Sequence, residues 1–189
     1  MAFPNWSLPL LCALFMALSL VSLNTAGLKD HAKIRSVLGS PRWDVLCLQE
    51  VRWDEDWLRQ FKSVCRDHVF ASLGSVHSCG VVVVVRASTG LTPTLAHADT
   101  EGRALIVDCS GPVAFRLINI YAPNEIEEKL PFFQNIFNQV TDNTILIGDF
   151  NTALSKIDIS DNNVYKNDRS RAILYEKIQK HDLTDIWRS

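Results

Sequence analysis

The apolar residues of the chain fall into short runs, and turn-forming or charged residues separate one run from the next. Runs of this length that are rich in valine, isoleucine and leucine are typical of β-strands. The first, third and last of the predicted strands are expected to be buried, and Ser-Gly-Pro between the fourth and fifth predicts a hairpin. The predicted strands are Leu18–Asn24, Asp44–Gln49, Gly80–Val85, Arg103–Cys109, Val113–Tyr121 and Thr144–Phe150.

Other segments carry apolar residues at the spacing of an α-helix. They are Leu28–Leu38, the residues after Asp54, Asn124–Val140 and Asp168–Asp182. Asp54 and Asp168 are the expected N-caps of their helices. Pro131 is expected to break the early part of its helix. Phe61 and Val64 are expected on the buried face of the helix after Asp54.

The order of these elements predicts the fold class. Strands outnumber helices and hairpins mix with single crossovers, so we expect a layered α/β fold with strands in both directions, not a doubly wound parallel sheet. No internal repeat or linker divides the sequence, and one domain is therefore expected over residues 18–189. Residues 1–17 form an apolar leader. Its length suits a signal or a membrane anchor, but the lysine or arginine that starts a typical signal is absent. The alternative is therefore an extension before the first strand.

Composition limits the classes of function. Hydrophobic residues make up 47% and charged residues 21% of the chain, as in globular proteins. A net charge of −2 argues against a protein held on nucleic acid by bulk charge, but not against a metal-dependent nuclease. Among five cysteines there is no C-x-x-C pair, and Cys47, Cys79 and Cys109 lie in or beside apolar runs. We expect reduced thiols, which favour a reducing compartment.

Polar side chains end several of the predicted strands or follow them directly. They are Asn24, Glu50, Tyr121, Asp149 and Asn151. Because strand ends meet at the rim of a sheet, we expect these groups to converge. Carboxylates and amides of this kind suit a hard, oxygen-binding ion such as Mg²⁺.

Each of these residues also has an ordinary structural explanation. Asn24 and Glu50 suit turns and solvated strand ends, and Tyr121 suits an anchored core ring. The stretch Gly148-Asp149-Phe150-Asn151 is more specific, because Asp149 and Asn151 lie two residues apart and so share one side of the strand.

Five stretches of the chain together resemble the endonuclease/exonuclease/phosphatase family. They are SLNTAGL (22–28), LCLQEVRW (46–53), GRALIVDC (102–109), RLINIYAPN (116–124) and ILIGDFNTAL (145–154). The most similar branch is the apurinic-like endonuclease domain of LINE-type (non-LTR) retrotransposons, a relative of exonuclease III. The resemblance implies a four-layer α/β sandwich with the active site at one rim of two paired sheets.

The resemblance also implies a role for each site residue. Glu50 would be the Mg²⁺ ligand, with Mn²⁺ as the alternative ion, and Asn24 would help to hold the metal and the phosphate. Asp149 would orient or deprotonate the attacking water. Asn151 would hold the phosphate or the aspartate, and Tyr121 would donate a hydrogen bond to the phosphate. Phosphodiester hydrolysis needs such a metal, base and set of donors.

One part of the family pattern has no match. Family members carry a Ser-Asp-His motif near their end, and the sequence stops before it, so we expect the last strands to be missing and cleavage to be weakened or lost. The histidines are expected to be surface or structural residues. They are His31, His68, His77, His97 and His181.

These considerations favour a Mg²⁺-dependent DNA endonuclease of the retrotransposon type. The alternatives are an abasic-site DNA repair nuclease, a non-catalytic nucleic-acid-binding fragment and a secreted deoxyribonuclease-like enzyme. DNA is the expected partner, and no obligatory protein partner is evident. An intracellular, nuclear location is expected, with a secreted or membrane-anchored form as the alternative that the apolar leader raises.

Overall fold

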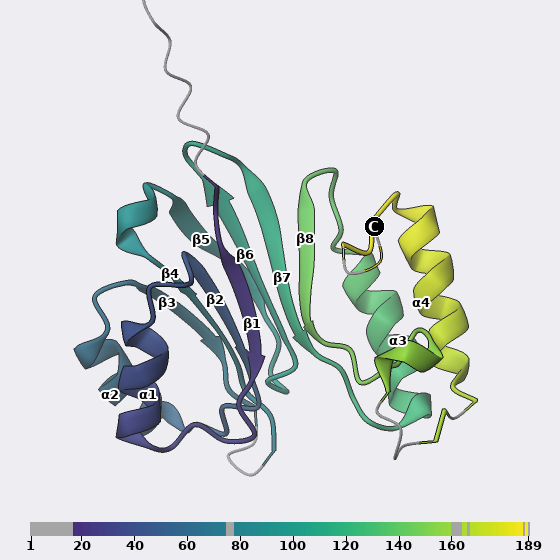
Figure 1. Cartoon of the computed structure of the whole chain (residues 1–189), viewed down its shortest axis with the longest axis horizontal. Coiled ribbons are helices and arrows are strands. Elements are labelled where there is room, and N and C mark those ends of the chain that lie inside the picture. The colour runs from purple at the N-terminus through teal and green to yellow at the C-terminus, as the bar shows by residue number, and fades with distance from the viewer. Residues whose placement is uncertain (1–16, 75–77, 160–163, 166, 187, 189) are drawn as a thin grey trace, which may run out of the picture.

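The computed structural model describes residues 17–74, 78–159, 164–165, 167–186 and 188. Within these residues two four-stranded sheets pack face to face, and a pair of helices covers the outer face of each (Figure 1). The first sheet contains β1 (Leu20–Asn24), β2 (Val45–Gln49), β4 (Val81–Val85) and β3 (His68–Ser72), in that order. The second contains β5 (Thr92–Ala98), β6 (Ala104–Ser110), β7 (Phe115–Tyr121) and β8 (Thr144–Asp149).

The helices lie on opposite outer faces of the two sheets. Helices α1 and α2 cover the first sheet, and α3 and α4 cover the second (Figure 1). Their bounds are α1 (His31–Gly39), α2 (Glu55–Val64), α3 (Ile126–Phe137) and α4 (Arg169–Lys180). Two short 3-10 turns, Ala87–Thr89 and Lys156–Asp158, complete the set. The order of layers is therefore helix, sheet, sheet, helix.

The two sheets have the same pattern of strand directions, although the order of their strands along the chain differs. Strand β1 is parallel to β2, and β8 is parallel to β7, whereas the remaining neighbours in both sheets are antiparallel. The predicted hairpin is confirmed as the β6–β7 pair. Strands β1, β2, β7 and β8 end at the same rim (Figure 1), and hydrogen bonds join the polar residues there.

Helix starts follow the capping residues that the sequence predicts. The Asp54 carboxylate accepts a hydrogen bond from the backbone N–H of Trp57 at 2.8 Å, and Asp168 accepts from that of Ser170 at 2.8 Å. The expectation that Pro131 breaks its helix is wrong, because α3 runs through it. Proline at position 131 removes the N–H that would bond to the Glu127 carbonyl, and both residues lie on the exposed side of the helix.

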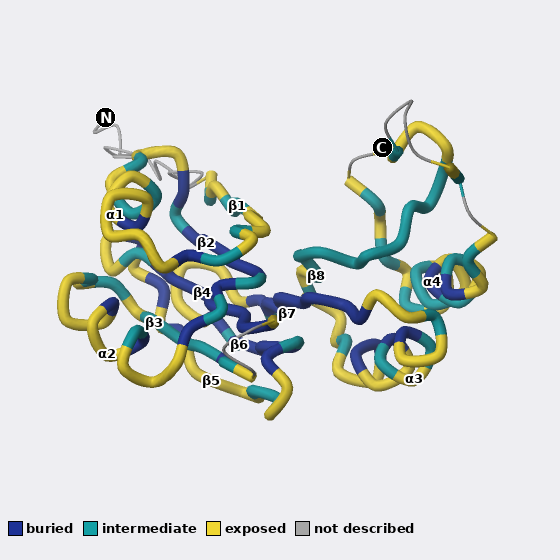
Figure 2. Tube along the Cα trace, turned by 90° about the horizontal axis from the view of Figure 1, so that it is seen from below, coloured by how far each residue is buried: buried dark blue, intermediate teal, exposed yellow. Residues whose placement is uncertain are grey.

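Three expectations about burial are also wrong. Strands β1 and β8 are only partly buried, with Leu23 42% and Ile145 36% exposed, because each is the edge strand of its sheet. Val64, at the last turn of α2, is 67% exposed. Figure 2 shows that full burial is concentrated in the inner strands. The prediction for β4 is confirmed, since all five valines of Val81–Val85 are buried.

A pair of amide side chains lies in the apolar space between the sheets. Gln49 and Asn119 are 1% and 0% exposed. Gln49 Nε2 donates to Asn119 Oδ1 at 2.7 Å, and Asn119 Nδ2 donates to the backbone oxygens of Leu48 and Val82, each at 3.1 Å. These bonds cross from one sheet to the other, and they fix how the sheets are aligned behind the rim.

The expected leader, residues 1–17, lies outside the described residues except for Ala17. None of the helices in the described part of the chain is long and apolar enough to cross a membrane. Cys47, Cys65, Cys79 and Cys109 are free thiols, and all but Cys65 are buried, as the sequence predicts.

Candidate active site

The five site residues predicted from the sequence lie together at one rim of the sandwich. Asn24 ends β1, Glu50 follows β2, Tyr121 ends β7 and Asp149 ends β8, with Asn151 two residues beyond. Hydrogen bonds join them across the two sheets. Both halves of the fold therefore contribute to one polar cluster.

Glu50 is the most heavily hydrogen-bonded member of this cluster. Its Oε1 accepts from the Tyr121 hydroxyl at 2.7 Å and from Asn24 Nδ2 at 3.2 Å, and its Oε2 accepts from Arg52 NH2 at 2.7 Å. Burial opposes ionisation of the carboxyl, but these bonds outweigh it, and the pKa of Glu50 is lowered. The side chain is therefore a carboxylate at neutral pH.

Tyr121 is held as a neutral phenol. Burial, and then the hydrogen bond to Glu50, raise the pKa of Tyr121 to about 12. The Arg103 guanidinium lies 5.5 Å from the centre of its ring. Its one hydroxyl proton is donated to Glu50, so in this structure the phenol holds the carboxylate rather than an external group.

Asn24 connects the two carboxylates. Its Nδ2 donates to Asp149 Oδ2 at 2.8 Å as well as to Glu50, while its Oδ1 accepts from the backbone N–H of Ala26 at 3.0 Å. The amide thus turns its nitrogen toward the carboxylates. One oxygen each of Glu50 and Asp149 points at the same atom, which brings the two acids together from separate sheets.

The segment after β8 is fixed by its own backbone geometry. Gly148 has a φ of 134°, and a Cβ placed there would lie 2.1 Å from the backbone oxygen of Ile120, so only glycine fits. Asn151 has a left-handed φ of 47°. Its backbone N–H donates to Asp149 Oδ1 at 3.0 Å, and its Nδ2 donates to the backbone oxygen of Ala122 at 2.7 Å.

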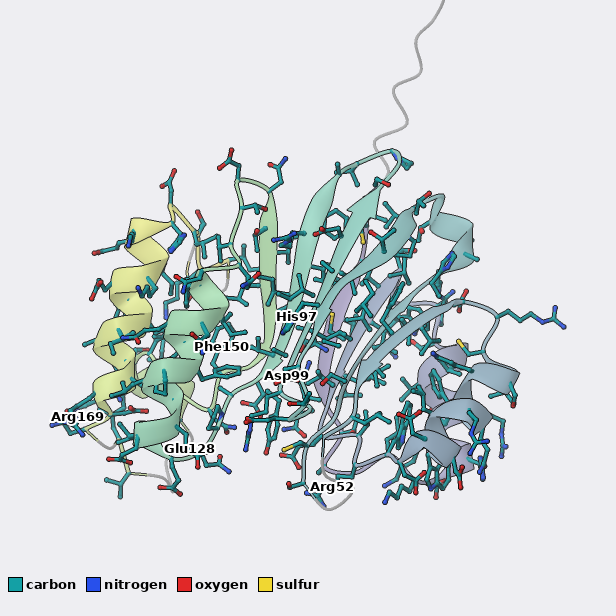
Figure 3. The ribbon with its side chains drawn as sticks, turned by 180° about the vertical axis from the view of Figure 1, so that it is seen from behind. Arg52, His97, Asp99, Glu128, Phe150 and Arg169 are labelled. Atoms are coloured by element: carbon teal, nitrogen blue, oxygen red, sulfur yellow. The ribbon has the colours of Figure 1, made fainter. Side chains whose placement is uncertain are left out.

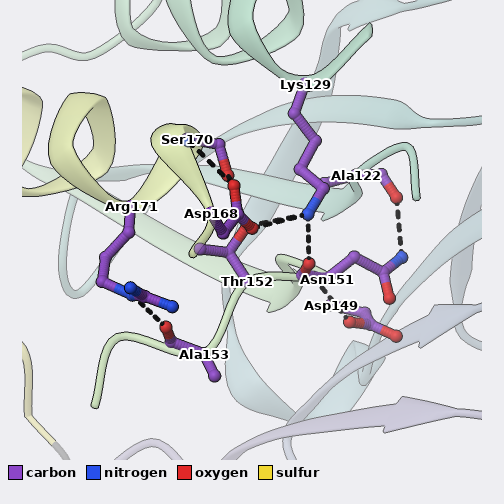
Figure 4. A network of polar contacts seen from close by, with 9 residues as sticks. All are labelled: Ala122, Lys129, Asp149, Asn151, Thr152, Ala153, Asp168, Ser170 and Arg171. Atoms are coloured by element: carbon purple, nitrogen blue, oxygen red, sulfur yellow. Dashed lines mark hydrogen bonds and ion pairs between the residues drawn. The ribbon is translucent and has the colours of Figure 1, made fainter. Parts of the chain in front are cut away.

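Two cations beside the site were not predicted from the sequence. Arg52 forms the ion pair with Glu50, and its Nε is buried without a hydrogen-bond partner among the described residues. Figure 3 places Arg52 at the same rim. Lys129, on α3, is 3% exposed and donates to the backbone oxygen of Asn151 at 2.6 Å (Figure 4). The sequence carries one indication that Lys129 is buried, because its spacing places it on the same helix face as Phe133 and Phe137.

The histidines with a described position lie away from this cluster. His31 and His181 each contact an aromatic ring of a neighbouring helix, and His68 and His97 are exposed residues of β3 and β5. His97 lies farther up the sheet than Arg52 in Figure 3. His77 lies outside the described residues.

A groove of about 750 Å³ opens beside Asp149 and runs between β8 and α4. Asp149, Phe150 and Asn151 line it at the rim, and Leu174 and Arg188 line it farther along. The cluster is thus accessible from solvent on the side of Asp149.

The donor set has the chemistry of a magnesium site with few protein ligands. Within the described ranges, no group of three or more His, Cys, Asp or Glu side chains is placed to hold a metal. Mg²⁺ is commonly bound through one or two carboxylates, with water and substrate phosphate completing the shell. Glu50 and Asp149, two carboxylates that converge on Asn24, fit that pattern.

Comparison with known proteins agrees with this geometry. The model of the Endonuclease/Exonuclease/phosphatase family matches residues 21–187. The fold is similar to that of the AP endonuclease LMAP from Leishmania major, with a TM-score of 0.72 and 20% identity, over 89% of this chain and 68% of that one. An AP endonuclease from Archaeoglobus fulgidus gives a TM-score of 0.69 and 20% identity, over 91% and 74%.

A third solved structure is the endonuclease domain of TRAS1, a telomere-specific non-LTR retrotransposon. Its TM-score is 0.61 at 15% identity, over 86% of this chain and 71% of that one. These likenesses confirm the expected four-layer α/β sandwich.

Proposed function

Because the chain belongs to the endonuclease/exonuclease/phosphatase family, we propose that it is a divalent-metal-dependent phosphodiesterase that cleaves DNA. The observation that carries the proposal is the pair of carboxylates, Glu50 and Asp149, which two separate sheets deliver to one amide at an open rim. Two carboxyl groups, of which that of Glu50 has a lowered pKa, and a phenol kept neutral beside them suit phosphodiester hydrolysis.

Glu50 and Asp149 are the groups proposed to hold Mg²⁺, with Mn²⁺ as the alternative. When bound, the ion neutralises charge on the phosphate oxygens. Asn24 positions both acids through its Nδ2. Arg52 and Tyr121 hold Glu50 from two sides, which fixes the direction of its carboxylate.

Asp149 is also the proposed base for the attacking water. Its Oδ1 accepts from the backbone N–H of Asn151 and its Oδ2 accepts from Asn24, so both oxygens are oriented before substrate arrives. The Asn151 side-chain amide carries two N–H groups, and one is donated to Ala122. We assign the second to a phosphate oxygen.

DNA is proposed as the substrate on two grounds. The five motif stretches resemble retrotransposon endonucleases, and the similar folds include two AP endonucleases and a retrotransposon endonuclease domain. We favour cleavage of intact duplex DNA. The second candidate, cleavage at abasic sites, is favoured by the two AP endonucleases.

The test is nicking of supercoiled plasmid by the 189-residue chain with Mg²⁺ or Mn²⁺. We expect slow nicking, because no described histidine lies at the cluster. EDTA should stop it, and Glu50→Gln or Asp149→Asn should lower it by about 10²–10³-fold. Asp108→Asn is the matched control, since Asp108 pairs with Arg116 on the strands rather than at the rim.

Three outcomes separate the alternatives. A duplex with one abasic analogue that is cut much faster than intact duplex favours the abasic-site function. DNA that is bound but never cut favours a non-catalytic binding protein. Nicking that survives both Glu50→Gln and Asp149→Asn contradicts the proposed site.

A further inference from the structure

Lys129 is a buried cation outside the polar cluster that reaches the backbone beside it. It lies on the second turn of α3, a helix whose neighbouring inward residues Phe133, Ile136 and Phe137 are apolar and buried. A lysine in such a place loses its hydration, and its charge must be matched by protein oxygens. The partners of its ammonium group therefore show what it does.

Those partners lie on two segments, one that lines the groove and one at the start of α4. Lys129 Nζ donates to the backbone oxygen of Asn151 at 2.6 Å and to Asp168 Oδ2 at 2.9 Å, with Thr152 Oγ1 at 3.4 Å (Figure 4). An ammonium group has three N–H donors, and three oxygens face them. One is the carbonyl of the residue that holds Asp149.

Asp168 ties this lysine to α4. Its Oδ1 accepts from the backbone N–H and the hydroxyl of Ser170, at 2.8 and 2.5 Å, so it caps the helix while its Oδ2 pairs with Lys129. The Ser170 hydroxyl lies 3.0 Å from Thr152 Oγ1, which closes a ring of polar contacts. Helices α3 and α4 thus both form hydrogen bonds to residues 151–152, in the short segment after Gly148.

We propose that Lys129 is a positioning residue that sets the direction of Asp149 through the backbone of Asn151. The Asn151 carbonyl is held by Lys129, its N–H by Asp149 and its side chain by Ala122. The left-handed φ of 47° at Asn151 is an uncommon conformation for a residue other than glycine. Loss of the bond to Lys129 lets the backbone at Asn151 relax, and the Asp149 carboxylate that accepts from the Asn151 N–H turns with it.

The inference rests on the proposed function for its kinetic consequence, but its structural part is tested without DNA. In Lys129→Met, we expect the Asn151 amide proton to exchange with solvent at least about tenfold faster, measured by NMR. Ile136→Ala is the control, because it truncates a buried residue of the same helix and leaves the polar ring in place. It should destabilise the fold without selective exposure of Asn151.

A double variant separates positioning from stability. Lys129→Met/Asp168→Asn removes both charges and keeps an N-capping side chain at the start of α4. It should regain most of the stability lost in Lys129→Met. The backbone amide proton of Asn151 should nevertheless still exchange fast with solvent, because the Asn151 carbonyl still lacks its donor. If protection of Asn151 returns with stability, Lys129 acts only as a structural ion-pair partner and the proposal is wrong.

The kinetic arm uses the same variants in the nicking assay at a temperature where all remain folded. We expect Lys129→Met and the double variant to lower kcat about 100-fold with KM unchanged, since small displacements of a reacting group have effects of this size. Ile136→Ala should retain wild-type kcat. Normal kcat in both Lys129 variants overturns the positioning role. A wild-type chain that shows no metal-dependent cleavage overturns the proposed function instead. The exchange rate of the Asn151 backbone amide then tests the positioning role alone.

Discussion

At the scale of single residues, the site depends on hydrogen bonds that hold one protonation state in each group. Glu50 is kept ionised by three donors, whereas Tyr121 is kept neutral by burial and by the carboxylate it faces. The two effects reinforce each other, because an ionised Glu50 disfavours a second negative charge on the phenol. The pair thus behaves as one hydrogen-bonded unit near neutral pH.

The first prediction concerns the ionisation of Tyr121. Its pKa of about 12 in the folded chain, above the ordinary 10.0, means that its contribution to folding stability is present below pH 10 and lost as the pH rises toward 12. Glu50→Gln removes the negative charge, so we expect the pKa of Tyr121 to fall toward 10. Phenolate absorbance followed during an alkaline titration measures this, with Tyr121→Phe to identify the signal.

Asp108→Asn serves as the control for this titration, because it removes a carboxylate that pairs with Arg116 instead. It should leave the ionisation of Tyr121 where it is in the unaltered chain. A Tyr121 titration that is identical with and without the Glu50 charge contradicts the coupling.

The sequence predicted that five polar residues at the ends of apolar strands would converge. Asn24, Glu50, Tyr121, Asp149 and Asn151 all lie in the cluster that the structure forms. Arg52 and Lys129 were not identified, because a charged residue in a loop or helix carries no sign of what it faces across the fold. Their partners come from chain folding in three dimensions, which a single sequence does not display.

At the scale of elements, burial follows the position of each strand within its sheet. Strands β2 and β4 are fully buried inner strands, but β1 and β8 are edges despite sequences of similar hydrophobicity. Hydrophobic pattern reports the faces of a strand and not its neighbours, so the sequence predicted burial for β1 and β8 as well as for β4. Strands β3 and β5 were not predicted at all. Strand β3 is only partly buried along most of its length, whereas β5 is largely exposed and contains Pro93.

The second prediction concerns Gly148 in β8. Alanine there combines a φ of 134° with a Cβ that meets the Ile120 oxygen at 2.1 Å, so we expect Gly148→Ala to lower the free energy of unfolding by about 2–3 kcal/mol. Urea unfolding followed by circular dichroism measures the loss. Gly39→Ala is the matched control, because a Cβ at Gly39, at the end of α1, meets nothing within 4 Å. A Gly148→Ala chain as stable as Gly39→Ala contradicts the close approach of β7 and β8.

At the scale of the whole molecule, the alignment of the two sheets rests on few polar contacts. The buried interior between the sheets is otherwise lined by valine, leucine and cysteine from both sides, with one phenylalanine and one tyrosine. Apolar side chains tolerate small shifts, whereas the hydrogen bonds of Gln49 and Asn119 require one register. The amide pair therefore specifies how Glu50 and Asp149, one from each sheet, face each other.

The third prediction follows from that buried pair. Asn119→Ala removes the side-chain donor that the oxygens of Leu48 and Val82 have now. It also removes the nearest acceptor of Gln49 Nε2, which is left with the longer contacts to Ser22 and Cys47 at 3.2 Å. Because unpaired buried polar groups are costly, we expect a loss of about 3 kcal/mol in the free energy of unfolding. Asn143→Ala, at an exposed position before β8, should change it by less than about 0.5 kcal/mol. Equal effects of the two substitutions in denaturant unfolding contradict the role of Asn119.

The bond between Asn24 and Asp149 joins residues 125 positions apart, and this separation decides when the site forms during folding. Contacts of long sequence separation form slowly, because closing a long loop costs conformational entropy first. Chains begin to fold from the N-terminus during synthesis. The first sheet ends at Val85, so the segment that carries Glu50 and Arg52 has been synthesised before the ribosome reaches Asp149. A growing chain carries only half of the proposed cleavage site until its second sheet docks.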